Sequence, residues 1–102
     1  MVDEAGDAPE RYLDPLIHPS IRLRICAALA AATRVEFSTV QRSTGATASK
    51  LSKNVATLTD AGYVRSTRAR EDSRRIWLEL TPEGRNAYTA HVAALRAIVG
   101  EG

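Results

Sequence analysis

The sequence predicts a mainly α-helical domain that carries one small β-hairpin, which is an α+β fold. Two observations lead to this prediction: apolar residues recur at helical spacing in several segments, and one later stretch alternates between apolar and polar residues. A chain of 102 residues with 44% apolar and 25% charged residues has room for one domain with one core.

The first half of the domain is expected to hold a helix, a brief strand and a second, shorter helix. The first helix begins at Pro19 or Ser20, because proline suits the first helical position and apolar residues follow it at helical spacing. "RVEF" at 34–37 alternates charged and apolar residues, which indicates a short strand. "STVQ" at 38–41 fits a capping box, and the helix that it opens is expected to end at Gly45.

The second half is expected to hold a third helix, a hairpin and a last helix. Thr47 can cap the third helix, and Gly62 can end it in a left-handed conformation. Residues 63–68 and 74–80 predict two strands around a polar turn. Thr81 can cap the last helix, with a proline at its first position.

The short second helix, the glycine turn and the third helix together form a helix-turn-helix, whose second helix can enter the major groove of DNA. A solvated polar face is the alternative for the third helix. Lys53 and Asn54 are the candidates for base contacts, because lysine suits guanine and asparagine suits adenine, whereas Lys50 can hold a phosphate. The DNA contacts expected from this segment are Thr47, Ser49, Lys50, Ser52, Lys53, Asn54 and Thr57.

The hairpin "RSTRAREDSRRIW" follows the third helix directly and is rich in arginine. It can reach the flanking backbone or the minor groove, where arginine is attracted by the enhanced negative potential of narrow segments. The contacts expected here are Arg68, Arg70, Arg74 and Arg75. Arg74 and Arg75 are expected to enter the second strand, while Glu71 and Asp72 indicate a tip that stays in water. Pairing of arginine with acid across a soluble turn is the alternative.

The charges are distributed unevenly along the chain. Residues 1–14 hold five acids against one arginine, so the rest of the chain carries a net charge of +6 within a formal total of +2. We expect residues 1–13 to be a mobile acidic segment and residues 14–102 to form the domain. A basic domain indicates a polyanionic partner, with nucleic acid first.

The apolar stripe of the last helix is wider than one small domain needs to cover. Packing on the first helix is one explanation, and a stripe shared with a second subunit is the one we favour. A two-fold dimer places two reading helices one DNA turn apart and predicts a pseudo-palindromic site. The residues expected at this interface are Tyr88, Val92, Leu95, Ile98 and Val99.

Three stretches carry a resemblance to a known family: "HPSIRLRICAAL", "STVQRSTGATASKLSKNVATLTDAGYV" and "RRIWLELTPEGR". They resemble the winged-helix transcriptional regulators, in particular the short MarR-like or ArsR-like group, over residues 14–100. The most specific pieces are "LSKNVATLTDAGYV" and "LTPEGR". The resemblance implies a winged helix-turn-helix fold and a homodimeric, sequence-specific regulator of transcription, with repression favoured, that dimerises through terminal helices.

Several classes of function are not expected. The sequence holds no phosphate loop, nucleophile elbow or zinc-hydrolase pair, so an enzyme is not expected. His18 and His91 do not make a metal cluster, and we expect no cofactor. Cys26 is expected to be a small buried hydrophobe, with a redox sensor as the alternative. An acidic N-terminus and the lack of a run of eighteen apolar residues argue against a membrane role and favour the cytoplasm.

Two further points stay open in the sequence. The rival function is a winged-helix module for protein association, which predicts an exposed apolar patch on the third helix or the hairpin. A small-molecule effector is also compatible with the resemblance, and its site would lie at the dimer interface or between that interface and the helix-turn-helix.

Overall fold

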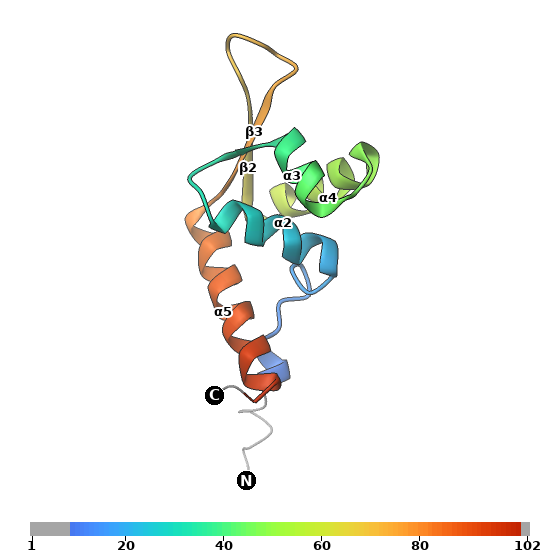
Figure 1. Ribbon diagram of the computed structural model, residues 1–102. Helices are drawn as coiled ribbons and strands as arrows, with labels where there is room; N and C mark the ends of the chain where they lie inside the picture. The colour runs from blue at the N-terminus through green and yellow to red at the C-terminus, as the bar shows by residue number, and fades with distance from the viewer. Residues whose placement is uncertain (1–8, 101–102) are drawn as a thin grey trace.

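The computed structural model of the protein describes residues 9–100, and Figure 1 shows its elements. Within these residues the chain forms a 3-10 helix, four α-helices and three short strands. In order they are η1 (Pro9–Tyr12), α2 (Ser20–Ala30), β1 (Val35–Glu36), α3 (Phe37–Thr44), α4 (Ala48–Asp60), β2 (Val64–Arg68), β3 (Ile76–Leu80) and α5 (Pro82–Ile98). The predicted α+β class is confirmed, including the short strand before the second helix.

The three strands form one antiparallel sheet in the order β1-β3-β2. Leu78 on β3 pairs with Val35 on β1, and Leu80 pairs with Val64 on β2. Leu78 and Leu80 are buried, whereas Trp77, which precedes Leu78, points to the opposite face of the sheet, because successive side chains of a strand alternate. The sheet therefore presents one apolar face to the helices.

The core lies between this face and the helices. Most of its fully buried members are aliphatic side chains from the helices and β3, including Ile25, Leu29, Val40, Leu51 and Leu78. In Figure 1 the α3–α4 pair lies to one side of the β2–β3 hairpin, which projects at the top, and α5 runs to the opposite end. We call residues 64–80 the wing, and its loop closes where the Ala69 N–H donates to the Arg75 carbonyl at 2.8 Å.

The predicted helix caps are confirmed at two of three places. The Thr47 hydroxyl accepts from the Lys50 N–H at 3.1 Å, and the Thr81 hydroxyl accepts from the Gly84 N–H at 2.9 Å. Gly45 ends α3 with a φ of 73°, a left-handed conformation that glycine adopts without strain.

The predicted capping box at 38–41 is wrong. α3 begins at Phe37, and its N-cap residue Glu36 makes no side-chain capping bond. Glu36 is also the last residue of β1, paired with Trp77, so the helix follows the strand without a gap. Ser38 consequently lies inside the first turn, where its side chain cannot act as the cap.

The N-terminal part of the domain begins earlier than residue 14. Pro9–Tyr12 forms η1, which packs against α5, although we expected residues 1–13 to be a mobile segment. Pro9 and Tyr12 supply apolar side chains in this segment, although the N-terminal stretch as a whole is acidic. Residues 1–8 lie outside the described residues. Among residues 9–100, no helix combines the length and apolarity needed to cross a lipid bilayer.

Candidate nucleic-acid interface

The outward face of α4 carries exposed polar and basic side chains. Its inward face anchors the helix through Leu51, Val55 and Leu58, which are all buried. Ser49, Lys50, Ser52 and Lys53 are exposed on the other side. The ammonium groups of both lysines form no ion pair or hydrogen bond with another described residue. These four side chains are therefore available to a partner.

Two threonines at the ends of this surface use their hydroxyls within the helix. Thr47 caps the first turn, and the Thr57 hydroxyl donates to the Lys53 carbonyl at 3.2 Å. Thr57 is half-buried, while Thr47 is exposed. Both side chains therefore shape α4 first, and Thr47 is the one that an outside partner can reach.

Asn54 lies inside the protein, in contrast to its expected role at a base edge. Its side chain is only 9% exposed, and its amide donates to the Lys50 carbonyl at 2.9 Å. The Arg22 guanidinium of α2 donates to the Asn54 side-chain oxygen at 2.9 Å, so both polar groups are occupied. Helical spacing explains this placement, because residue 54 lies three positions after Leu51 and four before Leu58, on the apolar stripe.

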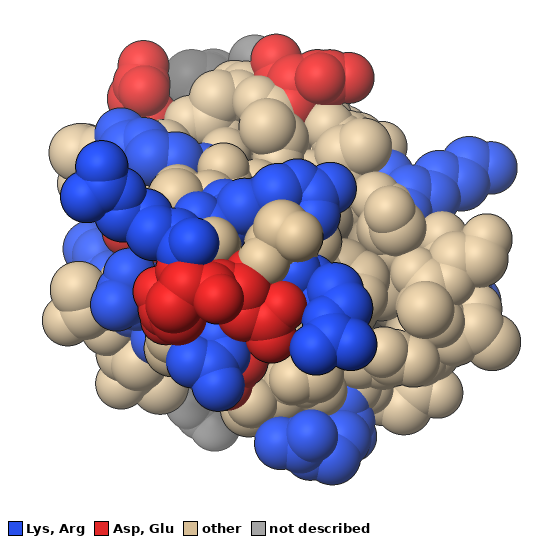
Figure 2. Space-filling model, turned by 90° about the horizontal axis from the view of Figure 1, so that it is seen from above, with Lys and Arg blue, Asp and Glu red and all other residues tan. Residues whose placement is uncertain are grey.

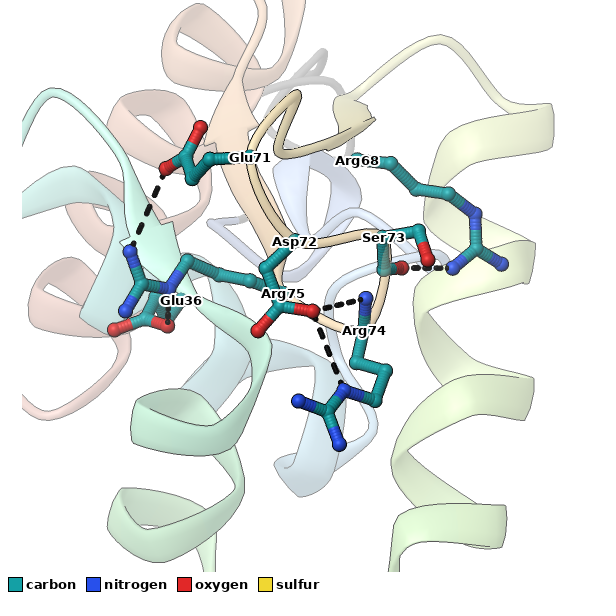
Figure 3. Close-up of polar contacts among 7 residues, drawn as sticks. All are labelled: Glu36, Arg68, Glu71, Asp72, Ser73, Arg74 and Arg75. Atoms are coloured by element: carbon teal, nitrogen blue, oxygen red, sulfur yellow. Dashed lines mark hydrogen bonds and ion pairs between the residues drawn. The ribbon is translucent and has the colours of Figure 1, made fainter.

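The wing arginines are held by acids and by the backbone, as Figure 3 shows. Arg75 pairs with Glu36 at 2.9 Å and with Glu71 at 3.6 Å. Arg74 pairs with Asp72 at 3.3 Å, and Arg68 donates to the Ser73 carbonyl. Arg70 makes no ion pair with another described residue.

The placement of Arg74 and Arg75 in a strand is wrong. β3 begins at Ile76, because the Arg75 N–H donates to the Asp72 carbonyl at 2.9 Å and so belongs to a turn. The side chain of Arg74 is 89% exposed, and an ion pair at such exposure contributes little to stability. A phosphate can therefore replace Asp72 as the partner of Arg74 at small cost.

Basic side chains outnumber acidic ones at the wing end of the molecule. Figure 2 looks down on this end and shows Lys and Arg side chains around a compact cluster of acidic atoms, with further acidic atoms at the upper edge and a mostly uncharged area on the right. Glu36, Glu71 and Asp72 all pair with arginine in this region, which limits their repulsion of a polyanion.

The apolar stripe of α5 divides into a covered and an open part. Tyr88 packs against the core, and Val92 and Leu95 are half-buried. Ile98 and Val99 are 38% and 70% exposed at the end of the helix. Beside them, η1 and α5 border a groove of about 360 Å³, which is lined by Pro9, Tyr12, Ala90, Ala93, Ala94 and Ala97.

A partly buried polar cluster that the sequence did not predict joins α5 to the residue before the wing. The Tyr63 hydroxyl donates to the Asp14 carboxylate at 2.6 Å, and the Asp14 N–H donates to His91 Nδ1 at 2.9 Å. His91 is fully buried, and its ring meets that of His18 edge-on at 5.8 Å. The sequence signal for the burial of His91 is its helical spacing from Ala87 and Ala94, which also lie on the inner side of α5.

This environment changes three pKa values. The hydrogen bond to Asp14 and burial raise the pKa of Tyr63 to about 12, so the hydroxyl stays a donor. Burial and the neighbouring His18 lower the pKa of His91, against the opposing effect of Asp14. Burial, together with the Asp14 charge, raises the pKa of the Cys26 thiol to about 11, which favours the inert, packed cysteine over the sensor. Within residues 9–100 no cluster of three or more potential ligands is arranged for a metal.

A helix-turn-helix made by α3 and α4, followed by a basic β2–β3 wing, defines a DNA-binding protein of the winged-helix class. The chain belongs to the winged helix DNA-binding domain family, which matches residues 21–99. The resemblance seen in the sequence is thereby confirmed. A comparison with curated proteins finds no match.

Solved structures of transcriptional regulators share this fold. A transcriptional regulator homologue from Pyrococcus horikoshii OT3 is 20% identical with a TM-score of 0.84, and the match covers 93% of this chain and 96% of that one. The regulator MosR of M. tuberculosis, in complex with DNA, is 25% identical with a TM-score of 0.74, over 95% of this chain and 70% of that one. PcaV of Streptomyces coelicolor, in complex with its natural ligand, is 21% identical with a TM-score of 0.74, over 91% of this chain and 68% of that one. MosR and PcaV are MarR-family regulators.

Proposed function

We propose that the protein is a sequence-specific, double-stranded DNA-binding repressor of transcription that acts as a homodimer. The observation that carries the proposal is the exposed face of α4, which adjoins an arginine-rich wing. The ammonium groups of Lys50 and Lys53 on this face have no partner in the described part of the chain. In this arrangement α4 enters the major groove, which is about 12 Å wide and admits one helix.

Roles can be assigned within this surface. Lys53 is the candidate for a base edge, while Lys50 and the hydroxyls of Ser49 and Ser52 hold phosphates. On the flank, Arg68, Arg70, Arg74 and Arg75 are the candidates for the backbone or the minor groove. Arg70 is free to bind directly, whereas Arg74 and Arg75 must first exchange their carboxylate partners for phosphate.

The homodimer is supported by the open end of α5. Ile98 and Val99 are exposed apolar side chains there, and the groove beside η1 extends the apolar surface. A second copy would cover both and would place two α4 helices about 34 to 36 Å apart, which corresponds to one turn of DNA. The operator is therefore expected to be pseudo-palindromic. The proposed location of this regulator is the cytoplasm.

The location of the apolar surface favours DNA over a protein partner for α4. Among the described residues the exposed large hydrophobic side chains are Tyr12, Ile98 and Val99, and none lies on α4 or the wing. A protein-association module that used α4 would need such a patch. PcaV, which shares the fold, was solved with its natural ligand, and an effector of this protein has its expected site at the dimer interface or between that interface and the helix-turn-helix.

Selection from a pool of random duplexes, followed by footprinting of the best site, tests the proposal. We expect a pseudo-palindromic sequence to be enriched and bound at least tenfold more tightly than unrelated duplex. Lys53→Ala should relax the base preference, whereas Arg74→Ala should weaken binding to all duplexes about equally. Equal affinity for selected and unrelated duplex would overturn the sequence-specific part of the proposal.

A further inference from the structure

Arg34 lies outside both the helix-turn-helix and the wing, in the loop between α2 and β1. Its guanidinium carbon sits 4.2 Å from the centre of the Trp77 ring on β3. Arg34 is exposed, and apart from this ring it has no hydrogen-bond or ion-pair partner among residues 9–100. Stacking on an aromatic face holds a guanidinium flat and leaves the N–H groups at its edge unsatisfied. The Trp77 ring therefore fixes the orientation of the Arg34 guanidinium, while no carboxylate among the described residues neutralises its charge.

A hollow of about 340 Å³ adjoins this arginine at the outer side of the wing. Its lining includes Arg34, Thr67, Arg68, Arg70, Glu71 and Trp77. Trp77 alternates with the buried Leu78 and pairs with Thr67 across the sheet, so the hollow lies on the sheet face opposite the core. It is thus separate from the outward face of α4.

The charges around the hollow favour an anion. Arg34 and Arg70 have no acidic partner, and Arg68 uses one N–H for the Ser73 carbonyl. Glu71 is the one acid that lines the hollow among the described residues, and it pairs with Arg75 at 3.6 Å. Three arginines against one paired carboxylate leave the hollow positive. The fork of donors on a stacked guanidinium matches the two oxygens of a phosphate.

We propose that this hollow is a phosphate-binding pocket that takes a backbone phosphate of DNA on the outer flank of the wing, with Arg34 as its central ligand. The inference rests on the proposed DNA binding and extends it, because the central ligand Arg34 belongs to neither α4 nor the wing. The footprint of each subunit then reaches past the wing. Trp77 positions Arg34 and does not itself stack on a base.

The experiment measures the affinity of wild-type protein and Arg34→Ala for two duplexes that share the selected central sequence. One continues past the wing on both sides, and the other ends before it. On the long duplex we expect Arg34→Ala to lose about tenfold in affinity and to lower the slope of log K against log salt by about one per subunit. On the short duplex the two proteins should bind alike. Arg34→Lys, which keeps the charge but not the planar fork, should lose part of the affinity.

Two controls keep the outcome interpretable. Arg24→Ala removes an exposed, unpaired arginine of α2 and should leave the difference between the two duplexes unchanged. Trp77 is the single tryptophan of the chain, so its fluorescence reports on the pocket and should change on binding the long duplex but not the short one. Inorganic phosphate at matched ionic strength should have little effect on this emission.

The possible failures are distinguishable. Equal losses for Arg34→Ala and Arg24→Ala, or equal losses on both duplexes, overturn the phosphate pocket and leave the proposed function intact. A Trp77 response to inorganic phosphate without a response to the long duplex assigns the pocket to a small anion and also overturns the inference. Absence of duplex binding by the wild-type protein overturns the proposed function and this inference together.

Discussion

Asp14 connects parts of the molecule that lie far apart in the sequence. Its carboxylate accepts from the Tyr63 hydroxyl at 2.6 Å and from the Leu16 N–H at 2.9 Å, and its own N–H donates to His91 at 2.9 Å. Tyr63 stands between α4 and the wing, and His91 belongs to α5. One residue thus holds the segment that follows α4 against α5.

The bond between Tyr63 and Asp14 should contribute measurably to stability. Tyr63→Phe removes the donor and leaves the carboxylate with one partner fewer, so we expect the free energy of unfolding in urea to fall by about 1–2 kcal/mol. Tyr88→Phe is the matched control, since the Tyr88 hydroxyl has no hydrogen bond to another described residue. Equal effects of the two substitutions would show that the Asp14 contact contributes nothing.

His91 should make stability depend on pH. Burial holds its pKa below the ordinary value of 6.5, so the unfolded chain takes up the proton before the folded protein does. The contribution is therefore fully present above about pH 6.5 and is lost as the pH falls toward the folded-state pKa. We expect the melting temperature to drop between about pH 7.5 and pH 5.5, and to drop less in His91→Gln. His18→Gln separates the influence of the neighbouring ring, and an unchanged pH profile in His91→Gln would refute this assignment.

At the scale of elements, the joint between the α4–β2 turn and the start of α5 is the tightest. The Thr81 hydroxyl donates to the Gly62 carbonyl at 2.6 Å, and the Thr81 N–H donates to the Tyr63 carbonyl at 3.0 Å. A Cβ atom at Gly84 would lie 2.1 Å from the Tyr63 carbonyl oxygen, which is a backbone atom and cannot turn aside. Only glycine permits this approach.

Gly84→Ala should consequently separate α5 from the base of the wing. Because backbone must move to relieve the clash, we expect a loss of about 3 kcal/mol in the free energy of unfolding. Asn86→Ala, at an exposed position of the same helix, should change stability by less than about 0.5 kcal/mol. Equal unfolding midpoints for the two variants would contradict the close packing.

The wing combines arginines with acids that oppose DNA binding. Glu71 pairs with Arg75 and lines the outer hollow. Glu71→Gln removes one negative charge from the wing and frees Arg75 in part, so duplex affinity at low salt should rise about threefold. Affinity is measured by filter binding or fluorescence. Glu83→Gln, which removes an equal charge from the first turn of α5, is the control in the same assay. A similar rise for both substitutions would show only a general charge effect.

At the scale of the whole molecule, the end of α5 opposite the wing is the surface that the domain leaves uncovered. Val99→Asp places a charge among the apolar side chains of this end, and we expect it to shift the protein from dimer to monomer in sedimentation analysis. Because each subunit would then bind a half-site alone, affinity for the selected operator should fall by more than tenfold. Thr33→Asp adds the same charge in an exposed loop and should stay dimeric. If the wild-type protein is a monomer at micromolar concentration, the prediction of a pseudo-palindromic operator loses its basis.

Local rules in the sequence determined the elements of this protein. Thr47 and Thr81 were recognised as caps because a capping hydroxyl acts within three residues of itself. The apolar stripes of α4 and α5 and the alternation of β3 follow from the spacing of residues near one another in the chain. These short-range features led to the helix-turn-helix, the wing and the winged-helix class.

Only the tertiary structure decided how single polar residues are used. Helical spacing turns Asn54 and His91 toward the inner faces of α4 and α5, but only the fold brings Arg22 of α2 to Asn54 and Asp14 to His91. Arg34 and Trp77 come together because β1 pairs with β3. Each of these contacts joins residues more than thirty positions apart, and no local pattern specifies such a pair. The physical reason is that burial and pairing of a polar side chain depend on which surfaces pack together, which is a property of the assembled fold.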